Sequence, residues 1–158
     1  MKITFGVINY NRLFYMKSCV ESLMKSIEDY EGEVEFICID DNSREPGTEE
    51  YLQSLTARGW KVINQEDYRT KRKVDIKAVK DLIDEYSAAL NIFLEESSGD
   101  LLVPLQGDMQ FVRNNWLQDY VSLFTEKDDA FVVMLDAQRK VRLNNAYFTD
   151  HTKQGNNI

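Results

Sequence analysis

Strand-like and helix-like patterns of hydrophobic positions alternate along this chain. Apolar residues occupy every second position over residues 3–7, and residues 34–39 form a nearly continuous apolar run, two patterns that are typical of strands. Between them, apolar residues recur at helical spacing from about 11 to 28, with Asn11 placed to cap the helix. This alternation favours a parallel sheet covered by helices.

The same alternation continues through most of the chain. The expected later elements are a helix at about 51–55, a strand at 60–64, a helix at 74–97, a strand at 101–105, a helix at 115–124 and a strand at 131–135. Pro104 cannot donate a hydrogen bond within a sheet, so we expect pairing to loosen just before Gln106. We therefore expect an α/β fold with a mostly parallel central sheet and helices on both faces. Residues 1–143 would form the domain, and residues 144–158 a polar C-terminal tail.

Composition restricts the partners and the chemistry of the chain. It has 158 residues and a net charge of -8, which argues against a nucleic-acid binder because such proteins neutralise phosphates with clustered Lys and Arg. An anionic ligand would have to be held by local charge or by a metal ion. His151 is the only histidine, so sites that need several imidazoles are excluded and oxygen ligands remain.

The sequence also carries expectations about location. No apolar run approaches the roughly 20 residues that span a bilayer, and the first residues lack the apolar stretch of a signal peptide. Cys19 and Cys38 lie in apolar segments, which favours buried thiols in a reducing compartment. We therefore expect a cytoplasmic protein without a transmembrane segment.

Polar residues follow the predicted strands at the points where they end. Asn9 and Asn11 follow the first strand, Asp40 and Asp41 the second, Gln65 the third, and residues 106–108 the fourth. Ligands of parallel α/β sheets bind outside the carboxyl ends of the strands. The sequence therefore predicts that these four loops share one rim.

Asp40 and Asp41 suit the recognition of a nucleoside. A carboxylate after a buried strand can accept hydrogen bonds from a base N–H or from ribose hydroxyls. The sequence Asp-Asn-Ser is equally common in turns, where the carboxylate caps the backbone. One of the two residues can serve each role.

Asp108 suits a metal-bound diphosphate. It is the only acid in residues 105–112, and Gly107 before it allows a diphosphate to approach closely. Mg and Mn combine few carboxylates with phosphate oxygens. The alternative is a solvated loop aspartate. A basic cluster, residues 69–73, could lie over the diphosphate or form a solvated loop.

Several segments together resemble the inverting family 2 glycosyltransferases, which have the GT-A fold. The matching segments are Gly-Val-Ile-Asn-Tyr-Asn-Arg at 6–12, Ile-Asp-Asp-Asn-Ser at 39–43, Ser-Gly-Asp at 98–100, Leu-Gln-Gly-Asp at 105–108 and Trp-Leu at 116–117. The resemblance implies a Rossmann-like nucleotide-sugar-binding domain in which Asn9 and Tyr10 contact the nucleotide. It further implies that Asp41 binds a uracil-type base and Asp108 the metal ion. The full candidate set for nucleotide binding is Asn9, Tyr10, Asn11, Asp40, Asp41, Gln106 and Gly107, with Asp108 as the metal ligand.

Three departures from the family pattern accompany this resemblance. Gln106 replaces the first acid of the Asp-x-Asp motif, and Ile8-Asn9 stand where the family has a Pro-Thr or similar pair. The acceptor-binding half, which supplies the catalytic base in such enzymes, has no counterpart in these residues. Asp136 and Asp150 match no known context, so the base stays unassigned.

The function implied by the resemblance is metal-assisted transfer, with inversion, of a sugar from a UDP-sugar to an acceptor hydroxyl. The acceptor would be a saccharide or another hydroxyl compound, the metal Mn or Mg, and the chain part of a larger chain or complex. The alternative is a catalytically inactive module that binds nucleotide-sugars or a partner. A nucleotidyltransferase is disfavoured because no glycine-rich, basic loop follows the first strand.

Overall fold

The computed structural model describes residues 1–71, 82–127, 129–130 and 132–133. The chain divides into two compact units, Met1–Asp119 and Tyr120–Ile158. The boundary expected after residue 143 lies outside the described residues and stays a prediction. The sheet and the site described below belong to the first unit, and α5 (Leu117–Glu126) crosses the boundary between the units.

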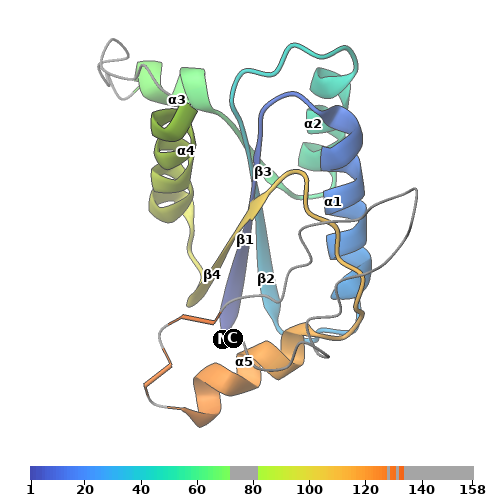
Figure 1. The fold of residues 1–158 in the computed structure, drawn as a ribbon, viewed down its shortest axis with the longest axis vertical. Helices are drawn as coiled ribbons and strands as arrows, with labels where there is room; N and C mark the ends of the chain where they lie inside the picture. Colours follow the sequence, from blue (N-terminus) through green and yellow to red (C-terminus); the bar gives the residue numbers. More distant parts are fainter. Residues whose placement is uncertain (72–81, 128, 131, 134–158) are drawn as a thin grey trace, which may run out of the picture. The chain divides into compact units, whose positions relative to one another are not determined.

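Strands and helices alternate from the N-terminus (Figure 1). The elements are β1 (Lys2–Asn9), α1 (Leu13–Ser26), β2 (Glu33–Asp40), α2 (Thr48–Ala57), β3 (Lys61–Asn64), α3 (Gln65–Lys71), α4 (Leu82–Glu96), β4 (Leu101–Gln106) and α5 (Leu117–Glu126). The strands form a sheet in the order β3-β2-β1-β4, and every neighbouring pair is parallel. The predicted parallel α/β sheet is therefore confirmed.

Helices cover both faces of this sheet, as expected. In Figure 1, α1 and α2 lie on one side of the strands, and α3 and α4 lie on the other. On the α4 side, Ile37 and Ile39 of β2 pack with Ala89, Ile92 and Phe93 of α4 in one buried cluster. These β2 residues alternate with Cys38, which is also buried, so both faces of the strand are covered.

The start of α1 differs from the prediction that Asn11 caps it. The helix begins at Leu13, and the preceding residue Arg12 makes no side-chain capping hydrogen bond. Instead, the Leu13 backbone N–H donates to Glu45 Oε2 at 2.7 Å. The Asn11 side chain is used elsewhere, since its Oδ1 accepts from the Arg44 backbone N–H at 2.9 Å. The prediction that Asn11 caps α1 was wrong, because Glu45 in the loop after β2 accepts the hydrogen bond from the first N–H of the helix.

Pro104 was expected to loosen the pairing of a central strand, but its strand β4 is the last in the described sheet order. Among the described strands, β4 pairs only with β1, and Pro104 is matched with Gly6. A proline is tolerated at such a sheet edge because its missing N–H leaves no neighbouring carbonyl unpaired. Of the expected strand at 131–135 only Val132 and Val133 are described, and neither lies in a strand.

The helices otherwise lie close to their expected positions. α4 is described from Leu82, and the earlier part of the helix expected from residue 74 lies outside the described residues. α3 was not predicted from the sequence. Within the described part of the chain, no helix is long and apolar enough to cross a membrane.

Both cysteines are buried and free, as the sequence indicated. Burial raises the pKa of the Cys19 thiol to about 11, and burial also raises the pKa of Cys38. Neither thiol ionises near neutral pH, so both act as apolar packing groups.

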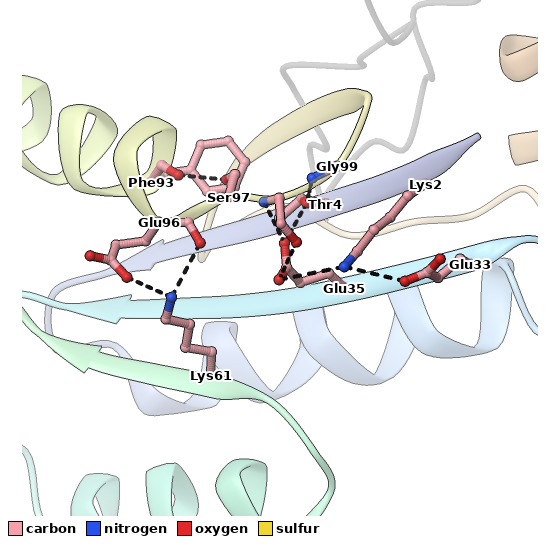
Figure 2. Close-up of polar contacts among 10 residues, drawn as sticks. Lys2, Thr4, Glu33, Glu35, Lys61, Phe93, Glu96, Ser97 and Gly99 are labelled. Carbon is pink, nitrogen blue, oxygen red and sulfur yellow. Dashed lines mark hydrogen bonds and ion pairs between the residues drawn. The ribbon is translucent and has the colours of Figure 1, made fainter.

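A polar cluster at the amino-terminal ends of β1 and β4 fixes the turn that leads into β4 (Figure 2). Glu35 accepts hydrogen bonds from Thr4 Oγ1 at 2.6 Å, from the Ser98 N–H at 2.9 Å and from Ser98 Oγ at 2.8 Å. The Gly99 N–H donates to Thr4 Oγ1 at 2.9 Å. A Cβ on Gly99 would lie 2.6 Å from that oxygen, so this turn requires glycine. The Ser-Gly-Asp segment at 98–100 therefore has a structural role at the end of the sheet away from the candidate site.

We expect this cluster to make folding stability depend on acid pH. Burial raises the pKa of Glu35, but the hydrogen bonds from Thr4 and Ser98 and the charge of Lys2 outweigh it and lower the pKa below its usual value. A lowered folded-state pKa contributes stability above the unfolded pKa of about 4.3, and this contribution is lost as the pH falls through the folded value. Urea unfolding of the wild type and of Glu35→Gln, between about pH 7 and about pH 3, measures it. The wild type should lose more stability than the variant, and parallel losses would contradict this assignment.

Candidate functional site

A cleft of about 230 Å³ opens at the carboxyl ends of the parallel strands. The ends of β1 and β4 and the loops after β1, β2 and β4 form one part of its lining, and α3 and α4 form the rest. The lining residues are Ile8, Asn9, Tyr10, Arg12, Asp41, Gln65, Glu85, Tyr86, Ala89, Gln106, Gly107 and Asp108. Asp41 and Asp108 therefore lie on one rim, as predicted from their positions after parallel strands.

Asp40 and Asp41 are adjacent but occupy different environments. Asp40 is buried, and its carboxylate accepts from Asn9 Nδ2 at 3.0 Å, from the Ser43 N–H at 2.8 Å and from Ser43 Oγ at 2.6 Å. These bonds tie the loop after β1 to the loop after β2. Asp40 does not line the cleft, and neither does Asn11. Asp40 thus has the capping role, and Asp41 is the one that lines the cleft.

The Asp41 carboxylate is half-buried and faces the cleft without a hydrogen-bond donor from the described residues. Its backbone N–H donates to the Asn9 carbonyl at 2.9 Å, which holds the residue at the strand end. Burial raises the pKa of Asp41, and the nearby charge of Glu85 raises it further, whereas Arg69 lowers it. A ligand N–H or O–H group that donated to this half-buried carboxylate would supply the hydrogen bond it lacks and would thereby bind more tightly.

Glu85 of α4 is held in the cleft wall by two buried side chains of α3. Its Oε2 accepts from Gln65 Nε2 at 2.8 Å and from Arg69 Nη2 at 2.6 Å. Gln65 is fully buried, and the Arg69 side chain is only 8% exposed. The carboxylate fixes the orientation of the Gln65 amide, because only the nitrogen can donate to it. The Arg69 cation is therefore paired with Glu85 and lies near enough to Asp41 for its charge to lower the pKa of that carboxyl.

The loop after β4 brings a glycine and a single carboxylate to the cleft. The Gly107 N–H donates to the Ile8 carbonyl at 2.9 Å. A Cβ at this position would lie 3.0 Å from Asn9 Oδ1, so the loop packs closely against the end of β1, and a larger residue would have to shift the Asn9 side chain by a few tenths of an ångström. Asp108 Oδ2 accepts from Arg12 Nη1 at 3.2 Å, which joins the loops after β1 and β4 across the cleft lining.

Arg12 has an unfavourable backbone conformation that this ion pair does not explain. Its φ of 58° and the φ of 51° at Asn11 are both in the left-handed region. That region costs roughly 1 to 2 kcal/mol for most residues, and asparagine tolerates it better than arginine. The side chains of Arg12 and Asp108 are 67% and 41% exposed, and exposed pairs contribute about 0 to 1 kcal/mol. The pair therefore does not offset the cost of the backbone.

Residues 4–154 match the family model of glycosyl transferase family 2. The chain belongs to glycosyl transferase family 2. The resemblance drawn from the sequence motifs is thereby confirmed. A search of curated proteins found no match.

Solved structures similar to this family 2 chain include several of S. aureus TarS. TarS 1–349 in complex with UDP has a TM-score of 0.56 at 18% identity, covering 93% of this chain and 43% of that one. The complex of TarS 1–349 with UDP-GlcNAc has a TM-score of 0.51 at 20% identity, with 80% and 32% covered. A third TarS structure has a TM-score of 0.55 at 20% identity, with 80% and 20% covered. The likeness confirms the GT-A fold, and the chain spans less than half the length of these proteins.

The family 2 cleft includes most of the predicted residues and several that sequence reasoning missed. Asn9, Tyr10, Asp41 and residues 106–108 line it, and their roles as ligands stay predictions. Arg12 was seen only as part of a motif. Glu85 and Tyr86 of α4 were missed, because the helix was analysed for its apolar face and no spacing links it to Asp41. Arg69 was read as part of a diphosphate-facing or solvated cluster, whereas it is buried against Glu85.

Asp108 offers a divalent cation a single carboxylate. Within the part of the chain that the structure describes, no group of three or more His, Cys, Asp or Glu side chains could hold a metal ion. Mg²⁺, however, is often bound by one or two carboxylates together with phosphate oxygens and water. Asp108 would therefore hold a cation only together with a bound diphosphate.

Proposed function

We propose that this family 2 domain binds a nucleotide-diphosphate sugar, with a UDP-sugar as the favoured donor. The domain would act in the transfer of the sugar to an acceptor hydroxyl, with inversion at the anomeric carbon. The observation that carries the proposal is the single cleft in which Asp41 and Asp108 both take part. The similar TarS structures in complex with UDP and with UDP-GlcNAc support UDP as the nucleotide. The acceptor is proposed to be a saccharide or another hydroxyl compound, and the location cytoplasmic, where the two free thiols would stay reduced.

In this reaction the acceptor oxygen attacks the anomeric carbon, and the bond from that carbon to the diphosphate oxygen breaks. The diphosphate leaves with the electron pair, and a general base takes the acceptor proton. Asp41 would accept the N–H of the base, and Tyr10, which is 58% exposed at the cleft, would cover its ring. Asp108 would hold the divalent cation, which when bound supplies charge for the departing diphosphate.

Binding of UDP tests the proposal directly. We expect Asp41→Asn to weaken UDP binding about tenfold to hundredfold, since a hydrogen bond to a charged group contributes roughly 1.5 to 3 kcal/mol. Asp108→Asn should remove only the part of the affinity that Mn adds. Isothermal titration with UDP, with and without Mn, measures both effects, and Asp29→Asn, an exposed carboxylate away from the cleft, serves as the control.

The same titration has an expected pH dependence. The raised pKa of Asp41 means that its carboxylate is protonated at a higher pH than an ordinary aspartate of pKa about 3.9. UDP affinity of the wild type should therefore fall as the pH is lowered through that raised value, and Asp41→Asn should lack this fall. Folded protein that binds UDP neither with nor without Mn would refute the proposed function.

A catalytically inactive nucleotide-sugar-binding module is the second candidate. Gln106 in place of an acid and the pairing of Asp108 with Arg12 favour it. Release of UDP from a UDP-sugar in the presence of Mn, without an acceptor, distinguishes the two. Slow release would support the transferase, and an intact donor that stays bound would support the binding module.

A further inference from the structure

The loop between β1 and α1 combines an unfavourable backbone with a charged side chain at the cleft. Among the described residues, the non-glycine residues with positive φ are Asn11, Arg12, Asn42 and Asn115. Asparagine commonly adopts this conformation because its side chain bonds to the nearby backbone, so only Arg12 requires an explanation. Backbone strain of this kind persists where surrounding contacts enforce it, and it gathers at functional sites.

The loop after β2 supplies the contacts that enforce this conformation. The Asn11 N–H donates to Ser43 Oγ at 2.7 Å, and the Arg44 N–H donates to Asn11 Oδ1 at 2.9 Å. On the other side of Arg12, the Leu13 N–H donates to Glu45 at 2.7 Å. Residues on both sides of Arg12 are therefore anchored to one neighbouring loop. This anchoring directs the Arg12 side chain to the cleft, where it meets Asp108.

The charges at this end of the cleft are unusual for a site that must take a diphosphate. Gln106 is neutral, Asp108 is the one carboxylate of the loop, and the cation at 3.2 Å from it belongs to the protein. A guanidinium presents paired N–H donors that match phosphate oxygens, and it needs no metal to do so. The pairing with Asp108 keeps this group at the cleft before a ligand arrives.

We propose that Arg12 is a diphosphate-binding residue that partly replaces the divalent cation: on nucleotide binding it moves from Asp108 to a phosphate oxygen and leaves the carboxylate to the metal. This inference rests on the proposed function, because it assumes that a nucleoside diphosphate occupies the cleft. It assigns the backbone strain at Arg12 to ligand binding. It also means that the metal and Arg12 neutralise the same diphosphate, so loss of one increases dependence on the other.

Titration calorimetry with UDP, in the presence of a chelator and in the presence of Mn, tests the proposal on folded protein. Arg12→Ala should lower metal-free affinity at least tenfold but Mn-supported affinity only about threefold, since the cation compensates in part. The ratio of affinities with and without Mn should therefore rise in Arg12→Ala. Arg12→Lys should restore part of the metal-free affinity because it keeps the charge, and Arg44→Ala, which removes an exposed cation that does not line the cleft, should change nothing.

Arg12→Gly separates the backbone from the side chain. Glycine adopts positive φ without strain, so this variant should unfold at a higher temperature than Arg12→Ala while showing the same loss of metal-free affinity. Metal-free affinity that is unchanged in Arg12→Ala, or a loss that is equal with and without Mn, would overturn the inference. Pyrophosphate is titrated in parallel, since it carries the diphosphate without the base. Binding of pyrophosphate through Arg12 without binding of UDP would refute the proposed donor and retain the role of Arg12, and binding of neither would refute both.

Discussion

Gly6→Ala is expected to destabilise this domain severely and to weaken any ligand binding in the cleft. A Cβ on Gly6 would lie 2.2 Å from Cδ2 and 2.4 Å from Cε2 of Phe93. The Phe93 ring is fully buried and packs with Ile37 and Ile39 of β2 in the core between α4 and the sheet. Overpacking of a core usually costs about 1 to 3 kcal/mol, against a total stability of about 5 to 15 kcal/mol for a domain. We expect a loss of at least about 3 kcal/mol, because α4 must move away from β1.

Urea unfolding measures this loss, and a double-mutant cycle identifies its cause. Phe93→Leu alone should also destabilise the protein, because buried area is lost. In the double variant Gly6→Ala with Phe93→Leu, however, the smaller side chain makes room for the methyl group. The two changes should therefore cost less together than the sum of their separate costs. Additive losses would show that Gly6 and Phe93 do not oppose each other in the folded protein.

The effect on ligand binding follows from the position of α4. This helix carries Glu85 and Tyr86 to the cleft, while β1 leads to Asn9 and Tyr10. A displacement of α4 relative to β1 would separate these two parts of the lining. UDP affinity should therefore fall in Gly6→Ala even under conditions where the variant is fully folded.

The fold could be predicted because its strands and helices carry strong hydrophobic patterns. The continuous apolar run at 34–39 became the central strand β2, and the helical spacing after Asn11 became α1. The same logic placed Asp41 and Asp108 at one edge, since the carboxyl ends of parallel strands lie together. These inferences needed only local pattern and one rule of topology.

The parts that could not be predicted depend on contacts between distant residues. α3 contains buried Gln65 and Arg69, whose burial is possible only because Glu85, sixteen residues beyond Arg69, accepts from both. A polar segment of this kind has no apolar face to reveal it. The backbone at Arg12 is likewise set by the loop that holds Ser43, not by its own sequence. Tertiary contacts therefore determined both features.

Arg69→Met is expected to destabilise the domain and to weaken nucleotide binding through Asp41. The change removes the cation from the buried pair with Glu85. Breaking a fully buried pair costs about 3 to 5 kcal/mol, and because the Glu85 side chain is 29% exposed we expect about 1 to 3 kcal/mol. Arg58→Met is the matched control, since its pair with Glu21 has side chains that are 36% and 60% exposed and should contribute about 0 to 1 kcal/mol.

The functional effect of Arg69→Met has a distinct signature. Arg69 lowers the pKa of Asp41, which burial and Glu85 raise, so its removal should raise that pKa further. UDP binding should then be lost at a higher pH in Arg69→Met than in the wild type, in addition to being weaker at neutral pH. Replacing both Arg69 and Glu85 with methionine removes the unpaired charge but also the carboxylate that accepts from buried Gln65. It should therefore restore part of the stability and return the acid loss of binding toward the wild-type pH. A pH profile of binding that is the same in all three proteins would mean that this cluster supports the fold alone and leaves Asp41 unaffected.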